Sequence, residues 1–135
     1  MEMDAATLLR KEIDRAVTAG QEGISPACLA SIKGLVRADP VHAPKVALET
    51  LLLHLKASHS QERLGALEIA DVLFQRSHPF RLGFVRQMDS VLILATGHSR
   101  EQPLPPPAKY ARKLRQEFCK VITRWNDAFG AKHKS

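Results

Sequence analysis

The chain has 135 residues, 44% of them hydrophobic and 25% charged, so it is long enough for one domain with a packed core. Only 5% of the residues are aromatic, while Leu and Ala are abundant, and this composition favours helices. No uncharged apolar run reaches the roughly 18 residues that a membrane-spanning helix needs, and the acidic start contains no apolar signal segment. We therefore expect no membrane span and a nuclear or cytosolic protein, in which Cys28 and Cys119 are reduced.

The net charge of +6 resides in the C-terminal part of the chain. Residues 1–107 contain 12 basic and 12 acidic residues, whereas residues 108–135 contain 8 basic and 2 acidic ones. Between them lies the run Gln102-Pro-Leu-Pro-Pro-Pro107, which cannot continue a helix and favours an extended conformation. We predict one helical domain with a body over 4–97, a proline-rich linker over 98–107 and a basic amphipathic helix over 108–131.

Start and stop signals divide the first part of the body into helices. Apolar residues three and four positions apart predict an amphipathic helix over 5–17, which Gly20 ends. Ser25 and Asp39 each precede a proline, a common helix start, and so predict a second and a third helix. The third helix runs to about residue 56, although another proline soon after Asp39 can delay its regular start.

Two helices in the middle of the chain are apolar on nearly every side. In the third helix Leu51 and Leu55 face one way, while Val46 and Leu53 face the other, so we predict burial on both faces. The fourth helix, rich in Leu and Ala through Phe74, is predicted to be largely buried as well. Two such helices favour a layered superhelix over a four-helix bundle, whose helices usually keep one polar side.

The remaining helix starts are marked by serines. Ser58 and Ser60 are both candidate N-caps of the fourth helix, and Ser58 with Gln61 resembles a capping box. Ser77, placed before a His-Pro pair, predicts the start of the fifth helix. Residues 88–96 either continue that helix or form a separate short one, and a buried strand is rejected because no partner strand is evident.

The last helix carries an apolar stripe with basic residues beside it. The stripe predicts packing against the body, with the basic residues in solvent. Two alternatives use the same charges, namely a weak, non-specific contact with nucleic acid and contact with an anionic membrane. The stripe consists of Tyr110, Leu114, Phe118, Val121, Ile122, Trp125 and Phe129.

The sequence contains no motif that is typical of an enzyme, a metal site or a cofactor site. None of the 6 histidines lies in an HExxH arrangement, and CxxC, phosphate-loop, GxGxxG and GxSxG patterns are missing. The acidic residues Glu68 and Asp71 stand at helical distances from Arg63 and Arg76 that favour ordinary surface pairing. We therefore predict a protein without catalytic residues, metal or cofactor.

Two blocks of this sequence resemble one family. The stretch from Arg63 to Arg81 contains Leu-Phe-Gln-Arg-Ser-His-Pro-Phe-Arg, and Gln102-Pro-Leu-Pro-Pro-Pro107 is followed by Lys113-Leu-Arg-Gln and later by Trp125-Asn. In order and spacing these blocks resemble the N-terminal domain of the UV-stimulated scaffold protein A family. The resemblance implies an all-α, VHS/ENTH-like right-handed superhelix of about six to eight helices.

The resemblance also implies a function. Members are nuclear, chromatin-associated scaffolds in transcription-coupled nucleotide excision repair, recruited to lesion-stalled RNA polymerase II through the Cockayne syndrome WD-repeat ubiquitin-ligase receptor. TFIIH and a deubiquitinase would be reached only through regions absent from this chain. Weak ubiquitin binding, common among VHS domains, is the alternative, although the usual aromatic residue is missing from the segment after Pro26. We expect no sequence-specific contact with nucleic acid.

Partner contacts are predicted in two places. One is the junction of the fourth and fifth helices, where polar residues either cap helices or form a contact patch. The other is the last helix, where arginines would supply polar contacts and a tryptophan is either an anchor or a core residue. The residues predicted to contact a partner are Arg76, His78, Arg81, Arg112, Arg115, Arg124 and Trp125.

Overall fold

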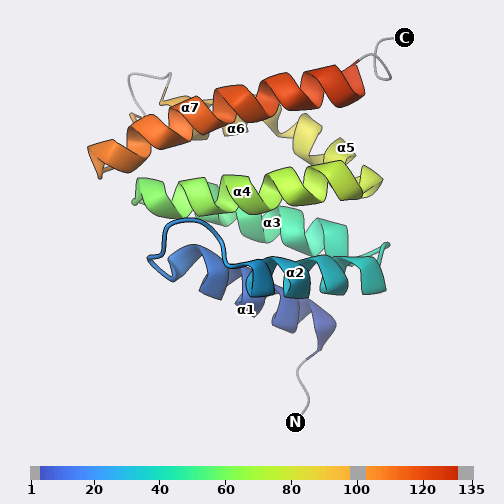
Figure 1. The fold of residues 1–135 in the computed structure, drawn as a ribbon. Coiled ribbons are helices and arrows are strands. Elements are labelled where there is room, and N and C mark those ends of the chain that lie inside the picture. Colours follow the sequence, from blue (N-terminus) through green and yellow to red (C-terminus); the bar gives the residue numbers. More distant parts are fainter. Residues whose placement is uncertain (1–3, 98–102, 131–135) are drawn as a thin grey trace.

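The computed structural model describes residues 4–97 and 103–130, which form seven α-helices and a terminal π-helical turn (Figure 1). Residues 98–102 of the predicted linker and residue 131 of the predicted last helix lie outside this description. Within the described residues there is no strand, so the prediction of an all-α superhelix is confirmed. The elements are α1 (Ala5–Thr18), α2 (Pro26–Ala38), α3 (Ala43–Leu55), α4 (Ser60–Arg76), α5 (His78–Arg86), α6 (Met88–Thr96), α7 (Ala108–Trp125) and η1 (Asn126–Gly130).

The helices stack in layers. In Figure 1 α1 and α2 lie at the bottom, α3 and α4 in the middle, and α7 crosses the top, with α5 and α6 behind it. Helix α3 is central and contacts α1, α2, α4, α5 and α6. Leu51 and Leu55 are fully buried, as expected, but Leu53 is 69% exposed. The second face of α3 is therefore covered less completely than its apolar sequence predicts.

Local signals place several helix ends correctly. The Ser25 hydroxyl oxygen accepts a hydrogen bond from the backbone N–H of Cys28 at 3.1 Å, and that of Ser77 accepts one from Phe80 at 3.2 Å. Gly97 ends α6 in the left-handed conformation, with φ of 65°, so α6 is a separate helix that stops where a glycine permits it.

The third helix starts later than the Asp39-Pro pair predicts. Regular structure begins at Ala43, with a proline in the first turn, and not directly after Asp39. The Asp39 carboxylate instead accepts a hydrogen bond from the backbone N–H of His42 at 3.1 Å, and this bond is the main reason that the pKa of Asp39 is lowered. The Asp-Pro pair therefore forms a turn that leads into the helix.

The capping box predicted at the start of α4 is wrong. Ser58 lies outside the helix, and the N-cap is His59, whose Nδ1 accepts from the backbone N–H of Gln61. Ser60 is fully buried because the proline-rich segment covers it. Its hydroxyl donates to the carbonyl oxygen of Pro105 at 2.6 Å, and its N–H donates to that of Pro106 at 3.0 Å. Residues 105 and 106 thus brace the first turn of α4.

The apolar stripe of the last helix packs into the main core, as predicted. Leu114, Phe118, Val121 and Trp125 are buried in the same cluster as the body of the domain, and α7 lies against α4 and α6. Leu104, in the segment before α7, also packs on this core. The basic helix is therefore an integral layer of the stack.

Arg63 does not form the surface ion pair that its spacing predicts. It is only 9% exposed; its Nε donates to the carbonyl oxygen of Ala57 at 2.7 Å and its Nη1 to that of Leu94 at 2.8 Å. These acceptors lie at the C-terminal ends of α3 and α6. Arg63 therefore joins two helix ends from inside the stack, where its N–H groups donate to carbonyl oxygens of the kind that receive no N–H donor from their own helix.

Candidate partner-binding surfaces

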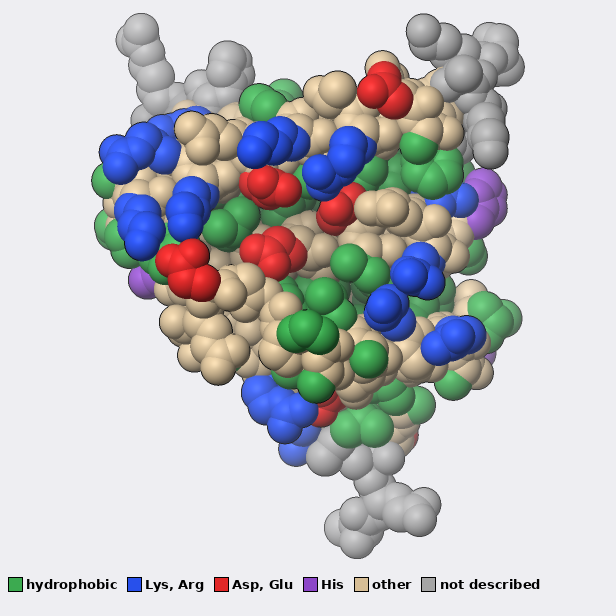
Figure 2. Space-filling view, in the orientation of Figure 1, with side chains coloured by type: hydrophobic (Ala, Val, Ile, Leu, Met, Phe, Trp, Pro, Cys, Tyr) green, Lys and Arg blue, Asp and Glu red, His purple; other side chains and the backbone are tan. Residues whose placement is uncertain are grey.

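Two of the predicted contact residues line a hollow at the junction of α2, α4 and α5. Arg76 and His78 lie on its rim, and the hollow has a volume of about 560 Å³. Lys33 and Arg37 of α2 complete the rim, although no sequence signal marked them. We call Lys33, Arg37, Arg76 and His78 the basic rim. Figure 2 shows Lys and Arg side chains gathered on the right of the view, over the C-terminal ends of α2 and α4.

Arg81 belongs to the packing of the last turn and does not line this hollow. Its Nη1 donates to the carbonyl oxygen of Phe74 at 2.6 Å, and its guanidinium carbon lies 4.2 Å from the ring centroid of Phe129. The side chain thus ties the C-terminal end of α4 to η1 through a hydrogen bond and a cation–π contact. Among the residues predicted at the α4–α5 junction, only Arg76 and His78 are exposed.

Helix α7 presents two arginines to solvent. Arg112 and Arg115 are exposed and have no ion-pair partner in the part of the chain that the structure describes. Arg124 is exposed too, but its Nη2 lies 2.9 Å from Asp71 Oδ2 and 3.9 Å from Glu117 Oε1. We call Arg112 and Arg115 the α7 arginine pair, because they stand three residues apart on one face of the helix.

The sequence left Trp125 as either an interface anchor or a core residue, and the structure places it in the core. Its side chain is 4% exposed and stacks on Phe74, with the ring centroids 3.8 Å apart. Its indole N–H donates to Asp71 Oδ1 at 2.7 Å. In this conformation Trp125 is not available to a partner.

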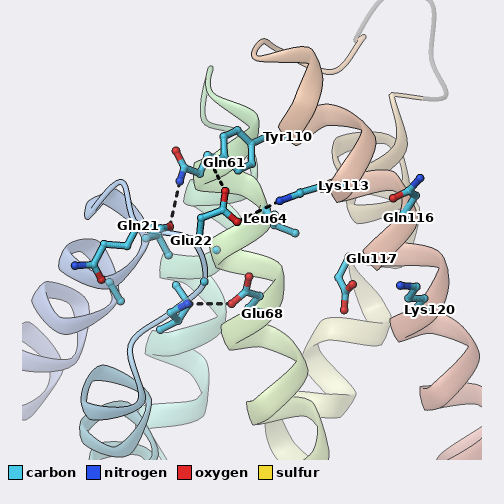
Figure 3. A pocket seen from close by; sticks show the side chains of 15 residues that line it. Gln21, Glu22, Gln61, Leu64, Glu68, Tyr110, Lys113, Gln116, Glu117 and Lys120 are labelled. Carbon is cyan, nitrogen blue, oxygen red and sulfur yellow. Dashed lines mark hydrogen bonds and ion pairs between the residues drawn. The ribbon is translucent and has the colours of Figure 1, made fainter.

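A polar groove of about 420 Å³ is lined by residues of the α1–α2 connection, α4 and α7 (Figure 3). The Glu22 carboxylate accepts hydrogen bonds from Lys113 at 3.2 Å, from the Tyr110 hydroxyl at 3.1 Å and from Lys109 at 3.4 Å. These donors, led by Lys113, lower the pKa of Glu22. The single carboxylate of the α1–α2 connection thus pairs with two lysines of α7 and offsets one of their two positive charges, whereas the α7 arginine pair has no such partner among the described residues.

Glu68 lies deeper in the same groove. Burial raises the pKa of its carboxyl group, the backbone N–H of Ile24 at 3.1 Å opposes that rise, and the negative charge of Glu117 adds to it. Glu117 and Lys120 reach into the groove from α7 (Figure 3). Among the described residues, the Glu68 carboxyl accepts the N–H of Ile24 and makes no hydrogen bond to a hydroxyl, thiol or histidine.

We expect Glu68→Gln to raise the free energy of unfolding at neutral pH. Because the pKa of Glu68 is raised in the folded state, its stabilising form is the protonated one. That contribution is complete below the unfolded pKa of about 4.3 and is lost as the pH rises through the higher folded value. Gln keeps an oxygen for the Ile24 N–H and carries no charge to bury.

Thermal unfolding followed by circular dichroism at pH 7 and near pH 3.5 tests this expectation. The melting temperature of the variant should exceed that of the wild type at neutral pH, and the difference should shrink in acid. Glu49→Gln, at an exposed position of α3, is the matched control and should change little. A Glu68→Gln protein that melts below the wild type at neutral pH would contradict the assignment.

His54 of α3 makes polar contacts with both α1 and α4. Its Nε2 lies 2.6 Å from Asp14 Oδ1 of α1, and its Nδ1 lies 2.8 Å from Glu62 Oε2 of α4. Within residues 4–97 and 103–130, no three His, Cys, Asp or Glu side chains are grouped so that they could hold a metal ion. Across the same residues, no helix has the length and apolar character needed to cross a membrane.

The fold and these surfaces define a VHS-like helical domain with charged, exposed sites suited to binding other macromolecules. A family model described as the UVSSA N-terminal domain matches residues 5–135, and the chain belongs to this family.

Curated relatives agree with the family match. UV-stimulated scaffold protein A of Bos taurus is 32% identical over 126 residues, which cover 93% of this chain and 18% of the relative. The protein of that name from Mus musculus is 31% identical over 126 residues, 93% of this chain and 17% of the relative. A homolog from Arabidopsis thaliana is 32% identical over 122 residues, 90% of this chain and 18% of the relative. The chain thus spans less than a fifth of the length of these relatives.

Proposed function

We propose that this domain is a non-catalytic docking module of a scaffold that acts in transcription-coupled nucleotide excision repair. On this proposal it is nuclear and associated with chromatin, and the Cockayne syndrome WD-repeat protein recruits it to lesion-stalled RNA polymerase II. Membership of the UVSSA N-terminal domain family and the name of the relatives, UV-stimulated scaffold protein A, support a scaffold role in DNA repair. On the same proposal, TFIIH and a deubiquitinase would be reached only through regions outside this chain, which spans 18% of the Bos taurus relative.

The observation that carries the docking proposal is the α7 arginine pair. In the body of the domain, Glu22 pairs with Lys109 and Lys113, and Asp71 pairs with Arg124. Arg112 and Arg115 are exposed and have no acidic partner among the described residues. The buried stripe of α7 fixes the helix, so both arginines are held on a rigid support. Arginine is enriched at protein interfaces because its planar guanidinium forms several directed hydrogen bonds.

The double variant Arg112→Glu with Arg115→Glu is expected to weaken binding to the purified Cockayne syndrome WD-repeat protein by at least about tenfold. Calorimetric titration at two salt concentrations measures this change, and the wild type should bind saturably at one to one. The matched control is Lys11→Glu with Lys45→Glu, which makes the same charge change on α1 and α3, and α1 lies at the opposite end of the stack from α7 (Figure 1).

The control should bind within about twofold of the wild type, because its charges lie away from the proposed interface. Circular dichroism should show equal helicity in all three proteins. If both double variants weakened binding equally, the loss of affinity would follow from the change in net charge, and this result would contradict the role of the arginine pair. If the wild-type domain does not bind at all, the proposed recruitment is wrong for this domain, and ubiquitin becomes the next partner to titrate.

A further inference from the structure

We propose that the hollow at the junction of α2, α4 and α5 is a second docking site, which takes an acidic peptide segment carrying one apolar side chain. The apolar side chain would enter the hollow, and the carboxylates on either side of it would meet the basic rim. The site is separate from the α7 arginine pair and does not depend on the function proposed for that pair.

The basic rim carries positive charge that the domain itself leaves uncompensated. Lys33, Arg37, Arg76 and His78 make no hydrogen bond or ion pair with side chains of the described residues, and no acidic residue is among those that line the hollow. Arg15 and Arg124, by comparison, each lie within 2.9 Å of a carboxylate oxygen. The rim is therefore complementary to an acidic ligand.

Helix-end electrostatics explain only part of this arrangement. Arg37 and Arg76 occupy the last turns of α2 and α4, where a positive charge stabilises the helix by itself. Lys33 lies a turn earlier in α2, away from its last turn, and His78 lies at the start of α5, where a basic side chain does not complement the helix dipole. Capping therefore does not account for the convergence of all four side chains on one hollow.

The floor of the hollow is apolar and rigid. Val36 and Leu73, which are 6% and 1% exposed, belong to the main core, so the floor is the outer surface of packed side chains. Pro40, Pro44 and Pro79 form much of the wall, and proline rings lose little conformational entropy when a ligand binds. A volume of about 560 Å³ lies within the range of about 300–1,000 Å³ that is typical of ligand clefts.

The combination of charge and apolar floor favours a peptide over nucleic acid. A phosphate backbone is matched best by an extended basic stripe, and bases are usually held by stacking on aromatic side chains. The lining residues include no phenylalanine, tyrosine or tryptophan, and the imidazole of His78 is the one aromatic ring among them; the basic residues share the hollow with apolar side chains. The nearby Asp39 does not line the hollow, and its carboxylate already accepts the N–H of His42.

Fluorescence anisotropy with the 135-residue chain tests the proposal. The probe is a short fluorescein-labelled peptide in which one phenylalanine is flanked on both sides by glutamates. Arg37→Gln with Arg76→Gln should weaken its binding by about tenfold, whereas Arg112→Gln with Arg115→Gln should leave it within about twofold. Neutral glutamine is chosen because it retains the helix propensity of arginine at both positions.

Two altered peptides keep the test independent of any folding defect in the variants. Replacing the phenylalanine by serine, or all glutamates by glutamines, should each weaken binding to the wild-type protein by at least about fivefold. The proposal is overturned if the acidic peptide does not bind, if both altered peptides bind as well as the parent, or if the two arginine double variants weaken binding equally. Tighter binding of a single-stranded or duplex oligonucleotide, lost in Arg37→Gln with Arg76→Gln, would also overturn it and assign the hollow to nucleic acid.

Discussion

Replacing Trp125 by alanine is expected to lower the free energy of unfolding by about 3–5 kcal/mol. The indole ring is 4% exposed, stacks on Phe74 at 3.8 Å and meets the edge of Phe84 at 5.3 Å between centroids. Alanine would leave a cavity between α4, α5 and α7. It would also remove the indole donor from the carboxylate of Asp71, which lies 2.7 Å away.

Urea denaturation followed by circular dichroism measures the loss. Trp125→Phe keeps most of the ring contact but not the N–H donor, so it should cost clearly less than alanine. Gln116→Ala, at an exposed position of the same helix, should change stability by less than about 0.5 kcal/mol. A Trp125→Ala protein with wild-type stability and impaired partner binding would instead make the indole an interface anchor.

Arg63→Met is expected to destabilise the domain by about 2–4 kcal/mol. Methionine fills much of the volume of the arginine stem, but it cannot donate to the carbonyl oxygens of Ala57 and Leu94, which now lie 2.7 and 2.8 Å from guanidinium nitrogens. Both acceptors would lose a charge-assisted hydrogen bond at a buried helix end. Burial lowers the pKa of Arg63, but the group remains charged in the physiological range.

Chemical denaturation of three variants separates the polar role from packing. Arg63→Lys retains one positive donor and should recover only part of the loss, because a single ammonium does not reproduce the fork of two donors. Arg10→Met, on the exposed face of α1, is the matched control and should be nearly neutral. If Arg63→Met were as stable as the wild type, the two buried hydrogen bonds would make no net contribution to the fold.

Local signals in the sequence predicted much of the fold. The N-caps at Ser25 and Ser77 and the stop at Gly97 depend on residues within one turn, so the sequence alone identifies them. The apolar stripe of α7 was equally clear, because its amphipathic period depends only on the order of residues in the helix. These features fixed the helical class and the place of the last helix in the core.

Three predictions were wrong because they depend on interactions between distant segments, namely the cap of α4, the surface pairing of Arg63 and the burial of Leu53. Ser60 donates to Pro105, which lies 45 residues away in the chain, so no local pattern predicts that contact. Arginine is usually exposed, and Arg63 is buried only because its hydrogen-bond acceptors lie at the ends of α3 and α6. The exposure of Leu53 has the same origin, since the number of neighbours around α3 is a property of the stack.

The candidate sites were predicted only in part. Sequence proximity marked Arg76 and His78, but Lys33 and Arg37 join them only because the fold brings α2 to the same hollow as the C-terminal end of α4. Arg81 and Trp125 have the residue types favoured at interfaces, yet the structure uses them to hold η1 and α7. Residue type alone does not distinguish an exposed arginine from one that is committed to packing.

Because the proline-rich segment holds the first turn of α4, we expect α4 and α7 to unfold together. The first turn of α4 takes its carbonyl acceptors from Pro105 and Pro106, and the last turns of α4 are covered by the indole of Trp125. If α7 detached, α4 would lose partners at both ends at once. Amide hydrogens of the two helices should therefore exchange with solvent as one cooperative unit, so that α7 cannot act as a detachable arm while the middle layer stays intact.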